Sequence, residues 1–221
     1  MELQRIVNDS ITVTQVSEPE DIYVDLSTLD FEKLKAAFTK VKKKNTMLYD
    51  LQQAVENQLE QMLKENPTRV TFYDRYQEII NEYNKGKSLE DTVRAFDNLS
   101  NFIRDLTFED ARAYREQLDQ ESLAIFDLLR NDKTLSTPEL KEVKKVAVEV
   151  LVRLKAEKLK VDRWRESRQI RAQVKTIIYD SLQWLPQETY SDQEVGERTA
   201  NVYQHIYTNY PGGSVNIYSR M

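Results

Sequence analysis

The sequence has no cysteine, one histidine, four glycines and five prolines among its 221 residues. The lack of cysteine excludes disulfide bonds, cysteine-ligated zinc, iron–sulfur clusters and thiol nucleophiles. Folds built of strands and turns need many glycines and prolines at their chain reversals, so the scarcity of both favours long helices with few joints. The sequence therefore predicts an all-α protein.

Long apolar runs are missing as well. No stretch approaches the roughly 18 apolar residues of a membrane-spanning helix. The N-terminal residues MELQRIVNDS lack the basic and apolar regions of a secretory signal. We therefore expect a cytoplasmic protein that has no membrane contact and binds no small-molecule ligand.

Charged residues make up 31% of the chain, but their signs are unevenly distributed. The segment Lys141–Lys175 holds twelve Lys and Arg against five Asp and Glu, a balance of +7. The rest of the chain therefore sums to −12, which together give the overall −5. A chain polarised in this way can present one basic surface to an anionic partner.

The apolar pattern predicts an irregular multi-helix bundle of about eight to nine helices over residues 28–210, with possible halves at 28–130 and 136–210. No repeat of fixed period indicates a solenoid. Residues 1–27 alternate apolar and polar side chains, so we expect a short extended arm that connects to a preceding domain. Residues 211–221 follow the last predicted helix and are expected to form a tail.

Helix starts are predicted where Ser, Thr, Asp or Asn stands at a capping position before an acidic residue or a proline. The expected capping pairs are Ser27–Asp30, Ser88–Asp91, Thr107–Asp110, Ser136–Glu139 and Ser191–Glu194, with Asn66, Asp119 and Asp162 as further N-caps. We expect a joint at Lys40–Lys44 and a left-handed glycine at Gly86 where a helix ends. Side chains expected on helix faces that turn inward include Leu89, Val93, Tyr114, Tyr207 and, on the helix after Asp162, Trp164.

Three sequence patterns resemble parts of nucleotide-binding or catalytic sites, but the sequence around each of them does not support such a site. A P-loop needs a glycine five residues before Gly86-Lys-Ser88, and that position is Asn81 in a predicted helix. The triplets Glu139-Leu-Lys141 and Glu142-Val-Lys144 match a nuclease motif in letters only, because they fall on a helix rather than on adjacent strands. His205 alone cannot complete a site built on paired histidines. We expect no catalytic, metal or cofactor site in this chain.

The clearest candidate for a functional surface is the basic segment 155–175, at a junction between two predicted helices. Its candidate residues are Lys155, Lys158, Lys160, Arg163, Trp164, Arg165, Arg168, Arg171 and Lys175. One interpretation is a surface that contacts DNA phosphates, and the other is a solvated face paired with neighbouring acids. The tyrosines at 73, 76 and 83 and at 203, 207 and 210 also have two interpretations, base stacking and core packing.

Four runs, in this order, resemble the C-terminal helical region of the restriction (R) subunit of type I restriction–modification enzymes. They are Asn66-Pro-Thr-Arg-Val70 with Phe72, Tyr76, Gln77, Glu78, Ile79 and Ile80 after it; Leu123-Ala-Ile-Phe-Asp-Leu-Leu129; Asp162-x-Trp164 with Arg168, Gln169, Arg171 and Ala172; and Val202-Tyr-Gln-His-Ile-Tyr207. The resemblance spans residues 30–210, whereas Gly212–Met221 matches nothing in the family.

The resemblance implies a part of an ATP-dependent endonuclease whose nuclease and motor domains, with their ATP and magnesium, precede this region. It also implies a docking role, in which this region joins the motor subunit to the methyltransferase (M) and specificity (S) subunits. The residues themselves leave two other roles open. One is contact with duplex DNA through the segment 155–175, and the other is a self-associating helical scaffold.

Overall fold

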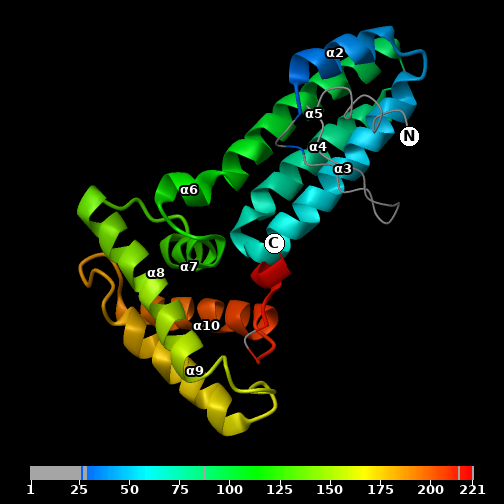
Figure 1. Ribbon diagram of the computed structural model, residues 1–221. Coiled ribbons are helices and arrows are strands. Elements are labelled where there is room, and N and C mark those ends of the chain that lie inside the picture. Colours follow the sequence, from blue (N-terminus) through cyan, green and yellow to red (C-terminus); the bar gives the residue numbers. More distant parts are fainter. Residues whose placement is uncertain (1–25, 27–28, 87, 214, 221) are drawn as a thin grey trace. The chain divides into compact units, whose positions relative to one another are not determined.

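The computed structural model describes residues 26, 29–86, 88–213 and 215–220 (Figure 1). These residues form nine α-helices and no β-strand, which confirms the predicted all-α fold. The arm expected at 1–27 lies outside the described residues except for Leu26. Ser27 lies outside them too, and the first described helix is capped by Asp30, whose carboxylate accepts hydrogen bonds from the N–H groups of Glu32 and Lys33.

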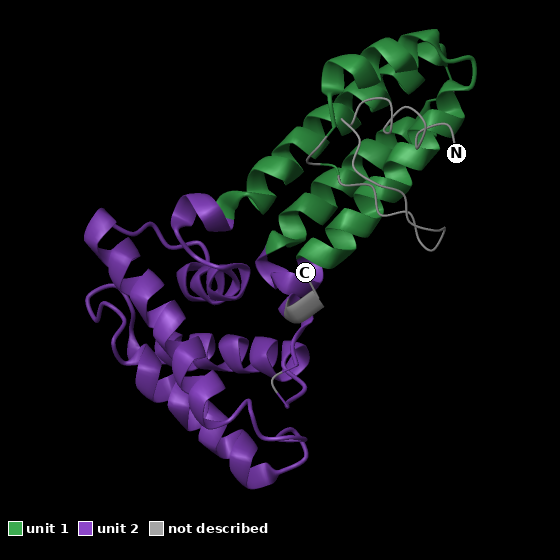
Figure 2. Ribbon diagram, in the orientation of Figure 1, with its two compact units in different colours: residues 1–62, 69–112 green, residues 63–68, 113–221 purple. Residues whose placement is uncertain are grey.

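Two compact units make up the chain (Figure 2). Unit 1 consists of residues 1–62 and 69–112, and unit 2 of residues 63–68 and 113–221. This division precedes the linker between 130 and 136, where the possible halves were expected to separate. The physical reason is that the helix Gln120–Arg130 packs chiefly against the helix Thr137–Glu157, which places it with the later helices.

Unit 1 is built from four helices around one apolar core. They are α2 (Phe31–Lys40), α3 (Lys44–Glu65, with its last turn in unit 2), α4 (Val70–Lys85) and α5 (Leu89–Asp110). The rings of Phe38 and Phe96 stack across α2 and α5 with centroids 3.9 Å apart. The break between α2 and α3 confirms the joint predicted at Lys40–Lys44.

Two expectations for α5 are wrong. The helix runs unbroken past Thr107, whose hydroxyl donates to the carbonyl of Ile103 (2.9 Å) inside the helix instead of capping a new one. Leu89 and Val93 are exposed, whereas Phe102 is buried. The core of unit 1 therefore meets a face of α5 that is rotated from the predicted stripe and that contains Thr92, Ala95, Phe96, Leu99, Phe102, Ile103 and Leu106.

Gly86 ends α4 as predicted, but its backbone is extended (φ −101°) and not left-handed. A side chain at this position would overlap the carboxyl group of Asp91. That carboxylate accepts hydrogen bonds from the N–H (3.1 Å) and the hydroxyl (2.6 Å) of Ser88, which confirms the predicted capping pair. A glycine is therefore required here by space rather than by backbone conformation.

Unit 2 contains a second apolar core. Its helices are α6 (Arg112–Glu116, which begins at the boundary), α7 (Gln120–Arg130), α8 (Thr137–Glu157), α9 (Arg168–Leu182) and α10 (Asp192–Asn209). The predicted N-caps Asp119, Ser136 and Ser191 are confirmed. Tyr114 of α6 was expected to be buried and is 89% exposed, so that prediction is wrong.

The N-cap predicted at Asp162 is also wrong. α9 begins at Arg168 and is capped by Ser167, whose hydroxyl accepts from the N–H of Ile170 (3.3 Å). The residues between α8 and α9 form turns, and Arg163 there has a left-handed backbone (φ +51°) that cannot continue a helix. Trp164 therefore lies in a connection and not on a helix.

A polar network is buried where the C-terminal segment meets α10 and the end of α3. The hydroxyl of Tyr218 donates to the carbonyl of Glu65 (2.5 Å) and lies 3.0 Å from Nε2 of His205. The amide of Asn209 lies 3.0 Å from Nδ1 of His205 and donates to the carbonyl of Lys64 (3.3 Å). These partners suit a neutral imidazole protonated on Nε2. Within the segment 211–221, which was expected to form a tail, Tyr218 is thus packed into unit 2.

Two glycine-to-alanine substitutions test whether Gly86 is required for reasons of space, because they are expected to change stability in opposite directions. Gly86→Ala should destabilise the chain by about 1 kcal/mol, because the new side chain displaces the Asp91 carboxylate from its capping position. Gly196→Ala, in the exposed middle of α10 with no atom near the added methyl group, should stabilise it by about 0.5–1 kcal/mol. Thermal and denaturant unfolding measure both changes, and equal signs for the two variants would contradict the argument.

A second prediction concerns pH. Burial lowers the pKa of His205 from 6.5 to about 4. As pH falls below 6.5, His205 binds a proton in the unfolded chain but not yet in the folded chain. The free energy of unfolding therefore decreases until pH reaches about 4, by about 3 kcal/mol in total. The chain has one histidine, so its NMR titration should report this pKa directly. His205→Gln should lose stability over this pH range far less steeply, and an unchanged slope would contradict the assignment.

Candidate functional site

The connection between α8 and α9, residues 158–167, and Arg168 at the start of α9 carry most of the candidate basic residues, and we call residues 158–168 the cationic loop. It lies at the lower end of Figure 1. Its central anchor is Trp164, whose indole Nε1 donates to the carbonyl of Tyr210 (2.7 Å) just after α10. The backbone of Gly212, with φ +119°, lies so close to the carbonyl of Val161 that a side chain there would overlap it. The loop is therefore held against the C-terminal end of α10.

Trp164 is not part of the surface, although the sequence placed it among the candidate surface residues. Its side chain is 0% exposed and meets the ring of Tyr207 edge-on, with centroids 5.9 Å apart. The indole can be buried at little cost because its single hydrogen-bond donor, Nε1, is satisfied by the carbonyl of Tyr210. Its role is to fix the loop, which corrects the expectation that it faces a partner.

Four of the candidate cations are used inside unit 2. Arg165 donates to the carbonyl of Thr208 (2.9 Å), lies over the ring of Tyr207 (5.3 Å) and has a pKa lowered by burial. Arg171 donates to the carbonyl of Arg165. Lys175 lies over the ring of Tyr203 (4.6 Å).

Lys155 is the fourth of these cations. Its ammonium group pairs with the carboxylate of Glu121, which also accepts a hydrogen bond from the hydroxyl of Tyr210 (2.8 Å). For these four residues, the interpretation of a paired, structural charge is the better one.

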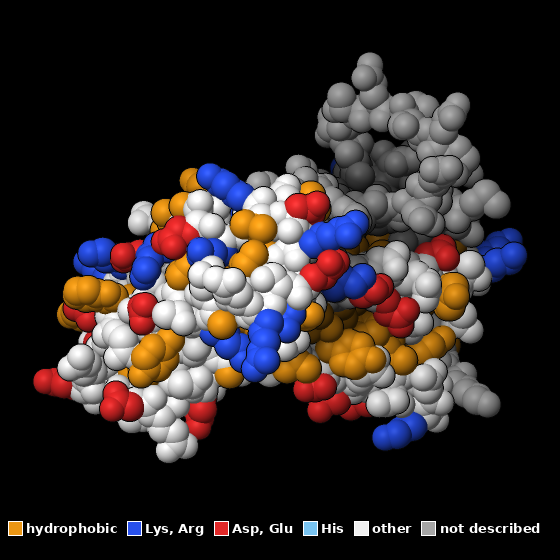
Figure 3. Space-filling view, turned by 90° about the horizontal axis from the view of Figure 1, so that it is seen from below, with side chains coloured by type: hydrophobic (Ala, Val, Ile, Leu, Met, Phe, Trp, Pro, Cys, Tyr) orange, Lys and Arg blue, Asp and Glu red, His pale blue; other side chains and the backbone are white. Residues whose placement is uncertain are grey.

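The other four candidate cations are Lys158, Lys160, Arg163 and Arg168. Within the part of the chain that the structure describes, none of them has a carboxylate or an aromatic ring as partner. Lys160, Arg163 and Arg168 are exposed, and Lys158 is half-buried. The loop holds five cations against Asp162 and Glu166, a balance of +3. Figure 3 views the molecule from below, which is the side on which this loop lies in Figure 1. A group of Lys and Arg side chains is visible near the middle of that view.

The tyrosine rows are divided between core and surface: Tyr76 and Tyr210 are buried, whereas Tyr73 is exposed and so is Tyr207, for which the prediction of an inward side chain is wrong. Tyr203 and Tyr207 lie with centroids 6.0 Å apart, and one face of each ring is covered by a cation. Tyr210 is buried. On α4, Tyr76 is buried and donates to Glu56 (2.8 Å), which together with burial raises its pKa. These rows offer few open ring faces on which bases could stack.

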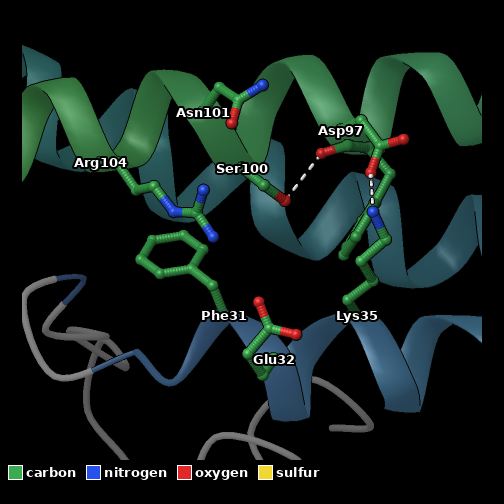
Figure 4. Close-up of a pocket in the computed structure, with 8 residues that line it drawn as sticks. Phe31, Glu32, Lys35, Asp97, Ser100, Asn101 and Arg104 are labelled. Atoms are coloured by element: carbon green, nitrogen blue, oxygen red, sulfur yellow. Dashed lines mark hydrogen bonds and ion pairs between the residues drawn. The ribbon is translucent and has the colours of Figure 1, made fainter.

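Unit 1 has a groove of about 370 Å³ between α2 and α5 (Figure 4). Its polar side chains pair across the groove: Lys35 and Asp97 form an ion pair (3.2 Å), and Arg104 lies over the ring of Phe31 (4.7 Å). Ser100 donates back to the carbonyl of Phe96 (2.8 Å) within α5. The groove is therefore lined by charges of both signs, and Lys35 and Asp97 neutralise each other across it.

The patterns considered for chemistry have structural partners. Ser88 and Glu139 cap α5 and α8, and His205 is buried in a hydrogen-bonded network. Among the residues that the structure describes, no group of three or more His, Asp or Glu side chains could hold a metal ion. In the same residues, no helix is both long and apolar enough to cross a membrane.

Comparison with known proteins identifies the family to which the chain belongs. No curated protein and no solved structure matches the chain. A family model described as "Type I restriction enzyme HindI endonuclease subunit-like, C-terminal" matches residues 1–209, which is nearly the whole sequence. The resemblance found in the sequence is thereby confirmed, and the chain belongs to this family of C-terminal regions of type I restriction endonuclease subunits.

Proposed function

We propose that this chain is a docking module that joins the R subunit of a type I restriction enzyme to its M and S subunits. Membership of the family supports a place in a multi-subunit enzyme. In this proposal the nuclease and the ATP-driven motor, with their magnesium and ATP, belong to preceding domains of the R subunit. The chain contributes a surface and no catalytic group.

The observation that carries the proposal is a set of exposed large apolar side chains on α8, on α9 and just after α9. These two helices of unit 2 pack against each other. They are Val148 and Val152 on α8, Tyr179 near the end of α9, and Trp184 just after it. Trp184 is 73% exposed. Exposed tryptophan is unfavourable in water and is among the residues that contribute most to binding at protein interfaces.

The geometry of α8 fits this role. Its inner face is buried, with Val143, Val146, Ala147, Val150, Leu151 and Leu154 in the core. Val148 and Val152 lie one turn apart on the opposite face, where neither has a core to cover. The exposed charges of Lys145 and Glu149 stand beside them, one of each sign. An apolar centre with a polar rim is the usual composition of a protein–protein interface.

The proposal predicts that the chain elutes together with purified M and S subunits in size-exclusion chromatography. Trp184→Ala and Val152→Asp should each weaken this association by about tenfold or more, because loss of an interface anchor costs about 2 kcal/mol. Leu89→Asp is the matched control, since Leu89 is equally exposed on unit 1. It should leave the association unchanged.

Three results would count against this proposal. Failure of the folded wild-type chain to elute with M and S at micromolar concentration would contradict docking itself. An equal loss for Leu89→Asp and Val152→Asp would show that the α8–α9 face is not the docking surface. Sedimentation that shows a dimer of the chain alone, abolished by Val152→Asp, would favour the self-associating scaffold.

A further inference from the structure

We propose that the cationic loop binds the phosphodiester backbone of duplex DNA without reading its sequence. The inference does not rest on docking to M and S, because it uses a different set of residues in unit 2. It starts from the division of the basic segment into two sets. Lys155, Arg165, Arg171 and Lys175 are used within the fold, whereas Lys158, Lys160, Arg163 and Arg168 are not.

The second set has no structural task among the described residues. Like charges that stand close together without partners repel one another and destabilise the folded chain. Lys160, Arg163 and Arg168 nevertheless stand exposed within one short loop. An anionic ligand offsets that repulsion, and a series of phosphates along one strand offers several negative charges at once.

The loop is also preorganised. Trp164 and Arg165 bond it to the end of α10, and Gly212 allows the two backbones to lie in contact. A rigid loop loses little conformational entropy when it binds, so more of the electrostatic attraction remains as affinity. α9 adds the positive end of its helix dipole beside Arg168.

The form of the loop favours backbone contact over base recognition. Trp164, the one aromatic ring within it, is buried, and one face of each nearby ring of Tyr203 and Tyr207 is covered by a cation. Unpaired bases therefore find few surfaces on which to stack, which disfavours single strands. A subunit of a restriction endonuclease works beside duplex DNA, and this favours DNA over an acidic protein as the anion.

The full chain can be tested by fluorescence anisotropy with two duplexes of equal length and unrelated sequence. Both should bind with the same affinity. If three or four phosphates are neutralised, the logarithm of the binding constant should fall against the logarithm of salt concentration with a slope of about −3 to −4. Between about 50 and 200 mM salt, this amounts to a loss of about 10²-fold.

Two double variants separate a local site from overall charge. Lys160→Glu with Arg168→Glu should weaken binding more than about tenfold and reduce the salt slope by about 2. Lys42→Glu with Lys43→Glu changes the net charge equally, at exposed positions between α2 and α3 of unit 1. This control should weaken binding about threefold at most. Lys160→Gln with Arg168→Gln should also reduce binding, since contacts are lost even without repulsion. Circular dichroism checks that all variants keep their helix content.

Several outcomes would overturn the inference. They are no binding to duplex DNA at low salt, equal losses in the loop and control variants, a marked preference for one duplex, and tighter binding to single strands. Binding to polyglutamate but not to DNA would identify an acidic protein as the partner instead. Because the chain is tested alone, none of these outcomes bears on docking to M and S.

Discussion

Every α-helix leaves four N–H groups at its start and four carbonyls at its end without partners inside the helix. A chain whose described part is almost entirely helical meets this constraint at many helix termini. Glycine often solves it at the C-terminal end by turning left-handed, but this sequence has four glycines and Gly86 is extended. Gln117 and Asn131 turn left-handed after α6 and α7 in place of glycine, and side chains from other elements donate to carbonyls at several helix ends, where they join the elements.

The same kind of contact recurs at five helix ends. Lys44 donates to the end of α2, Asn209 and Tyr218 to the end of α3, Lys144 to the end of α6, Tyr190 to the end of α7, and Arg165 and Trp164 to the end of α10. Each donor fixes a helix end to a residue elsewhere in its own unit. This explains why Asn209 and Tyr218 are buried, since they replace water at carbonyls that the core covers, and His205 is buried with them as their hydrogen-bond partner.

The constraint also clarifies the function of the basic segment. A cluster of cations in a sequence can serve helix ends and neighbouring acids, or it can serve a partner. Arg165 belongs to the first group, whereas Arg168, three residues later, is exposed and has no carboxylate or aromatic ring as partner among the described residues. The contact that buries Trp164 holds the remaining cations in one exposed loop. The exposed apolar side chains of α8 and of the turn after α9 are a different set of residues in the same unit.

The sequence by itself determined where most helices begin, because a capping pair lies within one turn of chain. Ser88–Asp91, Ser136–Glu139 and Ser191–Glu194 could be recognised for that reason. The same residue pattern gave wrong predictions at Thr107 and Asp162. The hydroxyl of Thr107 lies inside a helix and donates to a carbonyl of the preceding turn, and at Asp162 the chain forms a turn instead of starting a helix. Only the tertiary structure decided how helices end and which cations remain exposed. The donors and carbonyls involved are separated by 46 residues for Trp164 and Tyr210 and by 153 for Tyr218 and Glu65, and no local pattern connects groups so far apart.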